Sequence, residues 1–432
     1  MSTLGFREAF EALVPDAAAP AWLGDLRREA FQHFEAAGFP TRRQEAWRYT
    51  NVSAIAETTF ELGSDAGEDA SVTRAVNGAA FGETAATLVF VDGRFAPDLS
   101  RTLPEVATSL SVSWAGGSTG RPGPLGELVD PKLHPFAALN TAFLCDAARI
   151  EVPQNVTLEK PIHLIFVATP GARRVHHPRI LVGARASSRA TVVADFVSAS
   201  PEVSFCNAVT EIEVGPGANL DFVLCQRETS PTFHVSNLAA RVDRDARLAT
   251  HTLCLGGNLV RNDLQVRLVA EGAECRMNGL YLGTDRERID NYTEVCHEAP
   301  HGTSAELYKG ILAGSSHGVF RGRVIVAPDA QKTDARQQNP NLLLGAGAEV
   351  NSRPQLEIRA DDVKCSHGST VGRLDEEAIF YLRSRGVGTE HARTMLGQAF
   401  AAEIVDAVPD QGLRDALLAL ITARLWTTGE AS

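Results

Sequence analysis

The chain has 432 residues, of which 44% are hydrophobic and 22% are charged, ordinary proportions for a folded protein with a large core. Its net charge of −12 argues against nucleic acid or an anionic membrane surface as a partner, because phosphate binding needs clustered lysine and arginine. No stretch approaches the roughly 18 consecutive apolar residues of a membrane span, and the N-terminal residues lack the apolar run of a secretory signal.

The cysteine pattern predicts the compartment. The seven cysteines are odd in number and form no CxxC pair. We therefore expect reduced thiols in a cytoplasmic protein, most of them acting as small buried hydrophobes. They are Cys145, Cys206, Cys225, Cys254, Cys275, Cys296 and Cys365.

Residues 1–125 are predicted to form an N-terminal helical or mixed region. A helix is expected before the breakers Gly38 and Pro40, because apolar residues recur there at helical spacing: Leu23, Leu26, Ala30 and Phe34. Residues 61–85 are acidic and rich in small residues, which predicts a poorly specified linker. Leu88 to Phe95 predicts a hairpin around Asp-Gly. A patch rich in Gly, Ser and Pro, residues 116–126, marks the boundary.

Residues 126–373 are predicted to form a β-solenoid core, and from about residue 135 short strands with Gly, Asp and Asn turns prevail. Apolar residues alternate with polar ones in three stretches: Leu220, Phe222 and Leu224; Leu264, Val266 and Leu268; Leu356 and Ile358. A turn followed by Ala-x-apolar recurs at Ala218, Ala246, Ala273 and Ala305, with separations of 28, 27 and 32 residues. Such repeats of short strands indicate stacked coils. A β-sandwich is the alternative.

Residues 374–432 are predicted to be helical. Asp375 and Thr389 are expected N-caps, and Gly386 is expected to follow the end of a helix. One apolar stripe is expected before Pro409: Met395, Leu396, Ala399, Phe400, Ile404 and Val408. A final helix carries Leu413, Leu417, Leu420 and Ile421. This unit could cap the solenoid or dock a partner.

Cys365 and His367 are the most informative pair of side chains. They lie two residues apart in a predicted strand and therefore point to the same face. Thiolate and imidazole suit Fe–S clusters, zinc or copper. Two ligands make half a site, so the others must come from elsewhere or from another chain. The structural alternative is a buried thiol and a hydrogen-bonded imidazole inside the solenoid.

Other sequence motifs for catalysis, nucleotide binding or metal binding are weak or absent. The sequence has no P-loop, HExxH, GxSxG or zinc-like Cys/His quartet. The stretch from Gly345 to Val350 reads as a turn, not a dinucleotide fingerprint. His297, His301 and His317 could form a metal site near Cys296, although hydrogen-bonded strand and turn histidines are the commoner outcome.

Several segments together resemble the SufD proteins of the SufB/SufD family, scaffold subunits of the SUF iron–sulfur cluster assembly complex. The most specific block runs from Lys364-Cys365-Ser366-His367-Gly368 to Gly386. The segment Thr41 to Thr50 resembles the family's Glu-x-Trp-x-Tyr-Thr motif and favours SufD over SufB. Four further segments fit: Leu88–Phe95, Phe136–Phe143, Phe320–Gly322 and Asn339–Leu344.

The resemblance implies a right-handed parallel β-helix flanked by helical regions and a non-catalytic scaffold role. It implies pairing with SufB through the β-helix and docking of the ATPase SufC on the C-terminal helices, with residues 375–400 contributing. His367 would lie at the SufB interface beside a transient Fe–S cluster shared with SufB. Cys365, its neighbour on the same face, would be a second iron ligand. A flavin on the assembled complex is a remote possibility.

Two other functions stay open at this point. The first is a SufB-like scaffold that self-associates, which would make the isolated chain a homodimer. The second is a carbohydrate-active enzyme on a β-helix, suggested by acidic pairs such as Asp361-Asp362. The low aromatic content, 6%, argues against the second, because sugar sites use stacking aromatics.

Overall fold

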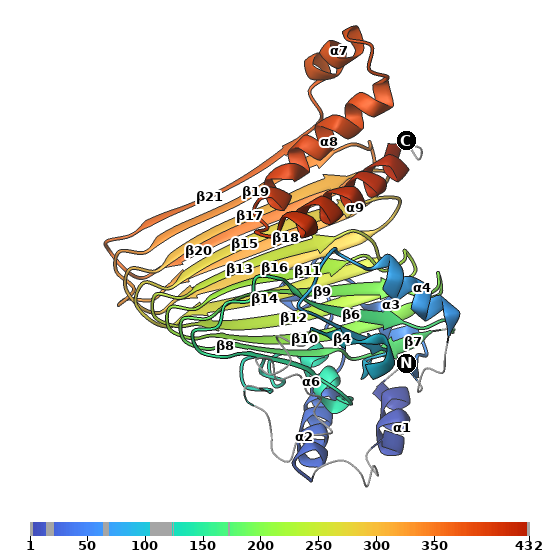
Figure 1. The fold of residues 1–432 in the computed structure, drawn as a ribbon, viewed down its shortest axis with the longest axis vertical. Coiled ribbons are helices and arrows are strands. Elements are labelled where there is room, and N and C mark those ends of the chain that lie inside the picture. Colours follow the sequence, from blue (N-terminus) through green and yellow to red (C-terminus); the bar gives the residue numbers. More distant parts are fainter. Residues whose placement is uncertain are drawn as a thin grey trace.

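The computed structural model describes residues 3–13, 21–63, 69–103, 123, 125–171 and 173–429. The chain is mainly β. Two sheets of parallel strands stack coil upon coil into a solenoid, with helices at its N-terminal end and along one side near its C-terminal end (Figure 1). The prediction of a β-solenoid flanked by helical regions is confirmed, and the β-sandwich is excluded by the parallel pairing.

Each coil contributes one strand to each sheet. Sheet A consists of β1 (Glu61–Leu62), β5 (Ala148–Val152), β7 (Arg174–His176), β8 (Arg179–Ala184), β10 (Ser204–Val214), β12 (Phe233–Val242), β14 (Leu259–Leu268), β16 (Arg288–His297), β18 (His317–Val326) and β20 (Glu349–Ile358). Sheet B consists of β2 (Ala86–Val91), β3 (Arg94–Phe95), β4 (Arg101–Thr102), β6 (Ile162–Ala168), β9 (Arg189–Ser198), β11 (Asn219–Gln226), β13 (Arg247–Cys254), β15 (Glu274–Gly283), β17 (Thr303–Leu312), β19 (Asp334–Leu343) and β21 (Lys364–Gly372). Only β3 and β4 run antiparallel to β2.

The turns that lead into the strands of sheet B share one backbone conformation. A residue with positive φ precedes a small residue at the same place in successive coils, and these residues are Ser187, Gly217, Asp245, Gly272, His301 and Lys332. Glycine and short polar side chains tolerate this conformation best, which explains the Gly and Asp turn signals in the sequence. Positive φ also shapes the turn of the Asp92-Gly93 hairpin, where both residues adopt it. That hairpin prediction is confirmed.

The strand register corrects one member of the predicted repeat. Asn219 pairs with Arg247, Arg247 with Glu274, and Glu274 with Thr303, so successive coils are offset by 28, 27 and 29 residues. Ala305 pairs with Arg276 inside the strand and is not the equivalent of Ala273. The error arose because an Ala-x-apolar triplet also fits the ordinary alternation of a strand.

Apolar side chains from both sheets fill the solenoid. The alternating residues of β11 and β14 are buried as predicted: Leu220, Phe222, Leu224, Leu264, Val266 and Leu268. Four cysteines are also buried, in agreement with their expected role as small hydrophobes: Cys206, Cys225, Cys254 and Cys275. The third alternating stretch is different, because Ile358 is 42% exposed at the end of the last sheet A strand.

Six helical segments lie in the described part of the first 103 residues. They are α1 (Thr3–Leu13), α2 (Ala21–Ala37), η1 (Glu45–Trp47), α3 (Ser53–Glu57), α4 (Ala70–Gly78) and η2 (Pro97–Leu99). The predicted helix ending at Gly38 is α2. Residues 64–68 of the linker predicted over 61–85 lie outside the described residues. On either side of them the prediction is wrong, because β1 pairs with β7 and Asp69 caps α4. Val72 anchors that helix in a small apolar cluster over β2 and β6.

Helix α6 (Pro135–Ala142) covers the first coils and interrupts the range that was expected to contain strands alone. All of its residues after Pro135 are buried, so it shows no amphipathic period in the sequence. Asn140 donates its amide hydrogens to the carbonyls of Pro178 and Asn207. The patch at 116–126 lies largely outside the described residues, and the division of the chain at residues 125 and 373 stays a prediction.

The C-terminal helices are α7 (Glu376–Ser384), α8 (Thr389–Asp406) and α9 (Gln411–Gly429). Asp375 caps α7, and Gly386 follows it with φ of 88°, as predicted. Gly388, not Thr389, is the N-cap of α8. No described helix has both the length and the apolar character that crossing a membrane requires.

Helix α8 buries only part of the stripe that its sequence suggested. Ile404 and, just after the helix, Val408 are buried as predicted, but Met395 and Ala399 are exposed. The other buried residues of the helix are Ala392, Thr394, Gly397, Ala401 and Val405. The helix turns small residues toward α9, since the Cβ position of Gly397 lies 3.4 Å from Leu425. The leucines predicted for the last helix do pack inward, with Leu413 and Leu417 fully buried.

Candidate functional site

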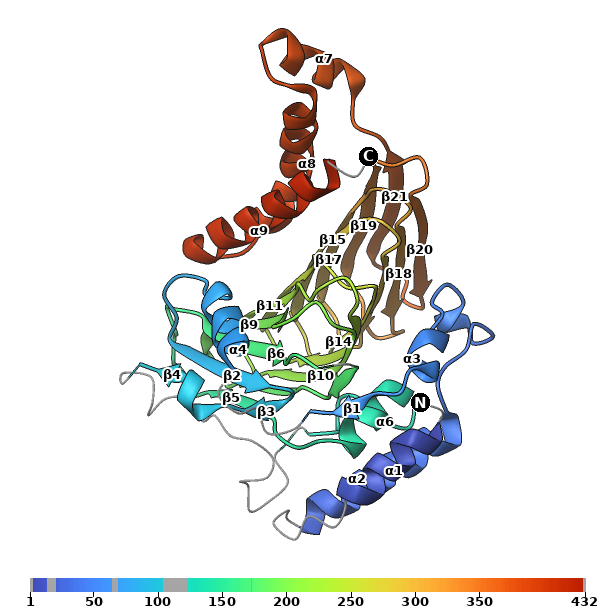
Figure 2. The same ribbon diagram turned by 90° about the vertical axis from the view of Figure 1, so that its right-hand side faces the viewer.

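The last coil leaves one end of the solenoid uncovered. Among the described residues β20 and β21 terminate sheets A and B, and Figure 2 shows them together at that end. Val326 is fully buried, yet its register partner Ile358 in the last coil is 42% exposed. Val371 on β21 is 55% exposed. We call β20 and β21 the open end, where inner-face side chains and two strand edges face outward.

Cys365 and His367 lie on β21 at this open end. Their register partners Ala335 and Gln337 on β19 are both buried inside the solenoid, which places the pair on the inner face. Cys365 is partly buried against an apolar cluster that includes Ala335, and burial raises the pKa of its thiol. His367 is exposed, so the alternative of a buried core imidazole is wrong.

A polar column leads from His367 into the solenoid. Gln337, its neighbour on β19, donates from Nε2 to Oε2 of Glu306 at 2.5 Å. Glu306 lies one coil deeper on β17, in register with Gln337. Burial raises the pKa of the Glu306 carboxyl to about 7, although hydrogen bonds from Thr293 and Gln337 oppose the shift. The inner face behind the open end is therefore not a purely apolar core.

We expect the Glu306→Gln variant to change how stability depends on pH. The pKa of Glu306 rises from 4.5 when unfolded to about 7 when folded, so the folded wild type binds more protons and loses stability as pH increases through this window. The loss is on the order of 3 kcal/mol, because one pKa unit equals about 1.4 kcal/mol. Urea unfolding at pH 5 and pH 8 should show a smaller difference for Glu306→Gln than for the wild type. Equal pH dependence in both proteins would contradict this assignment.

Asparagine and tyrosine side chains hold the last coils in register. The Nδ2 of Asn339 donates to the carbonyl of Tyr308 at 2.8 Å and to the hydroxyl of Tyr281 at 3.1 Å. The Tyr281 hydroxyl in turn donates to Asn341. All four side chains are buried, and hydrogen bonding satisfies polar atoms that burial would otherwise penalise. This explains the asparagines at the start of the segment Asn339–Leu344.

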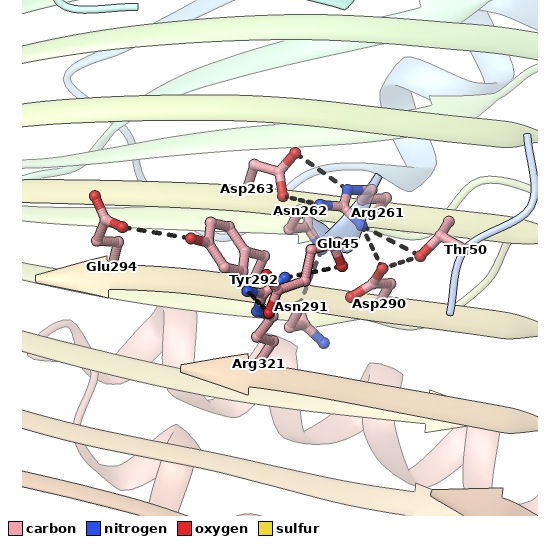
Figure 3. Close-up of polar contacts among 10 residues, drawn as sticks. All are labelled: Glu45, Thr50, Arg261, Asn262, Asp263, Asp290, Asn291, Tyr292, Glu294 and Arg321. Atoms are coloured by element: carbon pink, nitrogen blue, oxygen red, sulfur yellow. Dashed lines mark hydrogen bonds and ion pairs between the residues drawn. The ribbon is translucent and has the colours of Figure 1, made fainter. Parts of the chain in front are cut away.

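The segment Thr41–Thr50 clamps the N-terminal region onto the outer face of sheet A (Figure 3). Arg261 is buried, donates to Asp290 at 2.6 Å and to Asp263 at 2.8 Å, and lies 3.8 Å above the ring of Trp47. Thr50 donates to the same Asp290 carboxylate.

Glu45 extends the clamp toward the open end. Its carboxylate pairs with Arg321 at 3.2 Å on β18 and with Arg353 at 3.0 Å on β20. The motif therefore ties four successive sheet A strands, from β14 to β20, to the N-terminal region.

The C-terminal helices present two different surfaces. Helices α8 and α9 pack on the outer face of sheet B, where Lys309 pairs with Glu403 at 2.6 Å and Arg424 pairs with Glu287 at 2.5 Å. Helix α7 projects beyond the open end (Figures 1 and 2). Two neighbouring aromatic residues on it are exposed, Phe380 by 72% and Tyr381 by 58%.

The other candidate groups do not assemble into sites. His297 lies inside the solenoid and contacts Ser304, His301 occupies a turn, and His317 contacts Asn351. In the part of the chain that the structure describes, none of these three joins two further metal ligands. Asp361 and Asp362 lie in a bend between β20 and β21, and Asp362 pairs with Lys332.

One polar cluster was missed at the sequence level. His176, Cys206 and Glu228 are buried, and their ligand atoms lie within 4.8 Å of one another. A signal was available, because His176, Cys206 and His234 are spaced 30 and 28 residues apart, close to the coil length. No such group of three metal ligands within the described residues includes Cys365 or His367.

Comparison with known proteins identifies the family. Residues 166–400 match the SufBD core domain of the SUF system for FeS cluster assembly, and residues 6–164 match the SufBD protein N-terminal region. The iron–sulfur cluster assembly protein SufD of Escherichia coli is 35% identical over 92% of both chains. An iron–sulfur cluster assembly SufBD family protein of Synechocystis is 32% identical over 89% of this chain and 87% of its own.

The matched residues include the open end, the N-terminal clamp, α7 and α8 as far as residue 400. Together with the solenoid they establish that this chain belongs to the SufBD family of iron–sulfur cluster assembly proteins.

Proposed function

We propose that this chain is a non-catalytic SufD-type scaffold that pairs with a SufB-like chain through its open end. The observation that carries the proposal is the exposed inner face of β20 and β21, with Ile358 and Val371 uncovered beside Cys365 and His367. Unpaired strand edges that expose apolar residues are places where another chain adds strands. Burial of this surface by a second solenoid would continue both sheets.

The same pairing would complete a ligand set for a nascent cluster. Iron in Fe–S clusters is held by four protein or sulfide ligands per metal, and histidine can replace cysteine. Cys365 and His367 would supply thiolate and imidazole from one side, and the partner would supply the remainder. The cluster is cargo in this arrangement, held transiently at the interface and released to recipients.

Helix α7 is the proposed docking site for a SufC-like ATPase. Phe380 and Tyr381 are large and exposed, and such aromatics are the commonest anchors of protein interfaces. The helix lies next to the open end, so movement of a bound ATPase would be transmitted to the scaffold interface over a short path.

Co-expression of this chain with SufB-like and SufC-like chains, followed by affinity capture and native mass measurement, tests the pairing. We expect one SufB-like chain per captured chain. Val371→Asp should abolish that partner, because it places a charge on the inner face of β21, within the proposed contact. Leu133→Asp is the control, since Leu133 is 73% exposed far from the open end. Retention of the SufB-like chain by Val371→Asp would contradict the proposed interface.

A second variant separates ATPase docking from scaffold pairing. The double variant Phe380→Ala, Tyr381→Ala should lose the SufC-like chain and keep the SufB-like chain. Removing such aromatic anchors typically weakens binding of the partner by about 2 kcal/mol or more. A different result would favour the self-associating scaffold. In that case no SufB-like or SufC-like chain is captured, and the isolated protein forms a stable homodimer that Val371→Asp disrupts.

A further inference from the structure

One register position inside the early coils is occupied by polar residues. His176 on β7 pairs with Cys206 on β10, and Cys206 pairs with His234 on β12, so the three lie side by side across parallel strands. The same column continues with Val260 and Ile289, which are ordinary core residues. The fold therefore accepts aliphatic side chains at this position, and its geometry does not require the polar ones.

Glu228, which lies in the segment after β11, contacts this column of polar residues. Its Oε2 lies 2.6 Å from Nδ1 of His234 and accepts from Nε2 of Gln226 at 3.3 Å. The ligand atoms of His176, Cys206 and Glu228 are within 4.8 Å of one another, and each of these residues is at most 2% exposed. Carboxylates that bind metals are usually held by further hydrogen bonds, as Glu228 is here by His234 and Gln226.

The cluster also contains polar atoms without partners. Among the described residues, Nδ1 of His176, Oε1 of Glu228 and Nε2 of His234 are buried and accept or donate no hydrogen bond. Buried polar atoms are nearly always satisfied, because leaving them unpaired is costly.

We propose that His176, Cys206 and Glu228 bind one divalent cation of borderline softness, Zn²⁺ or Fe²⁺, and that His234 positions the carboxylate. Imidazole nitrogen, thiolate sulfur and carboxylate oxygen are the donors that these ions prefer. One thiolate and one carboxylate balance the charge of the ion inside an apolar core. On binding, the thiol proton of Cys206 leaves and the sulfur takes the metal in its place.

A small cavity of about 40 Å³ borders one of the proposed ligands, His176, and is also lined by Asp92, Arg94 and Cys145. It has enough space for a single ion or water. The strands that carry the cluster lie at the opposite end of the sheet from β20. The site is therefore structurally separate from the open end and independent of a SufB-like partner.

Titration of the metal-free full-length chain with Co²⁺ tests the proposal. We expect one Co²⁺ per chain with a thiolate-to-cobalt charge-transfer band in the near ultraviolet, and competition by Zn²⁺ or, without oxygen, by Fe²⁺. Cys206→Ala should lose the band, because it removes the thiolate, and His176→Gln should keep the thiolate but weaken binding at least tenfold. Cys275→Ala is the matched control, because Cys275 is an equally buried thiol in the same core several coils away.

The outcomes separate clearly. Zn²⁺ or Fe²⁺ should also raise the melting temperature of the wild type and of Cys275→Ala but not of folded Cys206→Ala. No band and no stoichiometric uptake by the folded wild type would overturn the proposal, as would an unchanged band in Cys206→Ala. Neither result would affect the pairing of the open end, because that is read from captured complexes.

Discussion

The His367→Ala variant is expected to fold and to assemble with its partners yet to fail in cluster formation. His367 is exposed on the last strand, so its removal creates no cavity and leaves no buried group unpaired. Loss of one ligand or of a group that orients a ligand typically reduces metal binding by about 10- to 100-fold. Iron and acid-labile sulfide per reconstituted complex, together with visible absorbance, measure the effect.

Ser369→Ala is the control for this variant. Ser369 occupies the next inner-face position of β21, in register with Asn339, and offers only a hydroxyl. We expect Ser369→Ala to support cluster formation at the wild-type level. Full activity of His367→Ala in a complex of unchanged composition would remove the role proposed for the imidazole. A complex that no longer assembles would assign His367 to the protein interface and contradict its role as a cluster ligand.

Arg261→Met is expected to lower the free energy of unfolding by about 3–5 kcal/mol, the usual effect of breaking a buried ion pair from one side. Arg261 is 1% exposed. It donates hydrogen bonds to Asp263 and Asp290 and packs over the ring of Trp47. Its loss leaves two buried carboxylates without a counter-charge. Chemical unfolding at pH 7 measures the change.

The control is Arg267→Met on the same strand. Arg267 pairs with Glu298 on the surface, and exposed pairs contribute at most about 1 kcal/mol. The deficit of Arg261→Met should shrink in acid, because burial already raises the pKa of Asp290 and protonation removes the uncompensated charge. Equal stability of the two variants would mean that the clamp holds the N-terminal region without stabilising the solenoid.

Local patterns predicted the elements that depend on neighbouring residues. The alternation in β11 and β14 predicted buried inner faces, and the turn residues before sheet B predicted the coils, because strand period and positive φ are properties of a few consecutive residues. The pairing of Cys365 and His367 on one face followed from the same period. Helix α6 escaped prediction because a helix buried on all sides has no polar face.

Amphipathic period also misplaced the buried face of α8. Gly397 and Ala401 face the neighbouring helix, whereas the larger Met395 is exposed. Close packing of two helices favours small residues at the contact, and the sequence alone does not say which face another element will cover. The exposure of Ile358 could not be predicted for the same reason. Its position in the alternation of apolar and polar residues is that of a core residue, and the sequence alone does not say that this strand is left uncovered.

Strand period, turn residues and helical spacing were enough to predict a solenoid, its flanking helices and the shared face of Cys365 and His367. Which coil lies open, and which distant polar residues meet, depends on how the coils stack. His176, Cys206 and Glu228 converge because coil lengths align them, and Glu306 lies behind His367 for the same reason. Those alignments depend on the exact number of residues in every intervening turn, which the stacking of complete coils sets and no local pattern encodes.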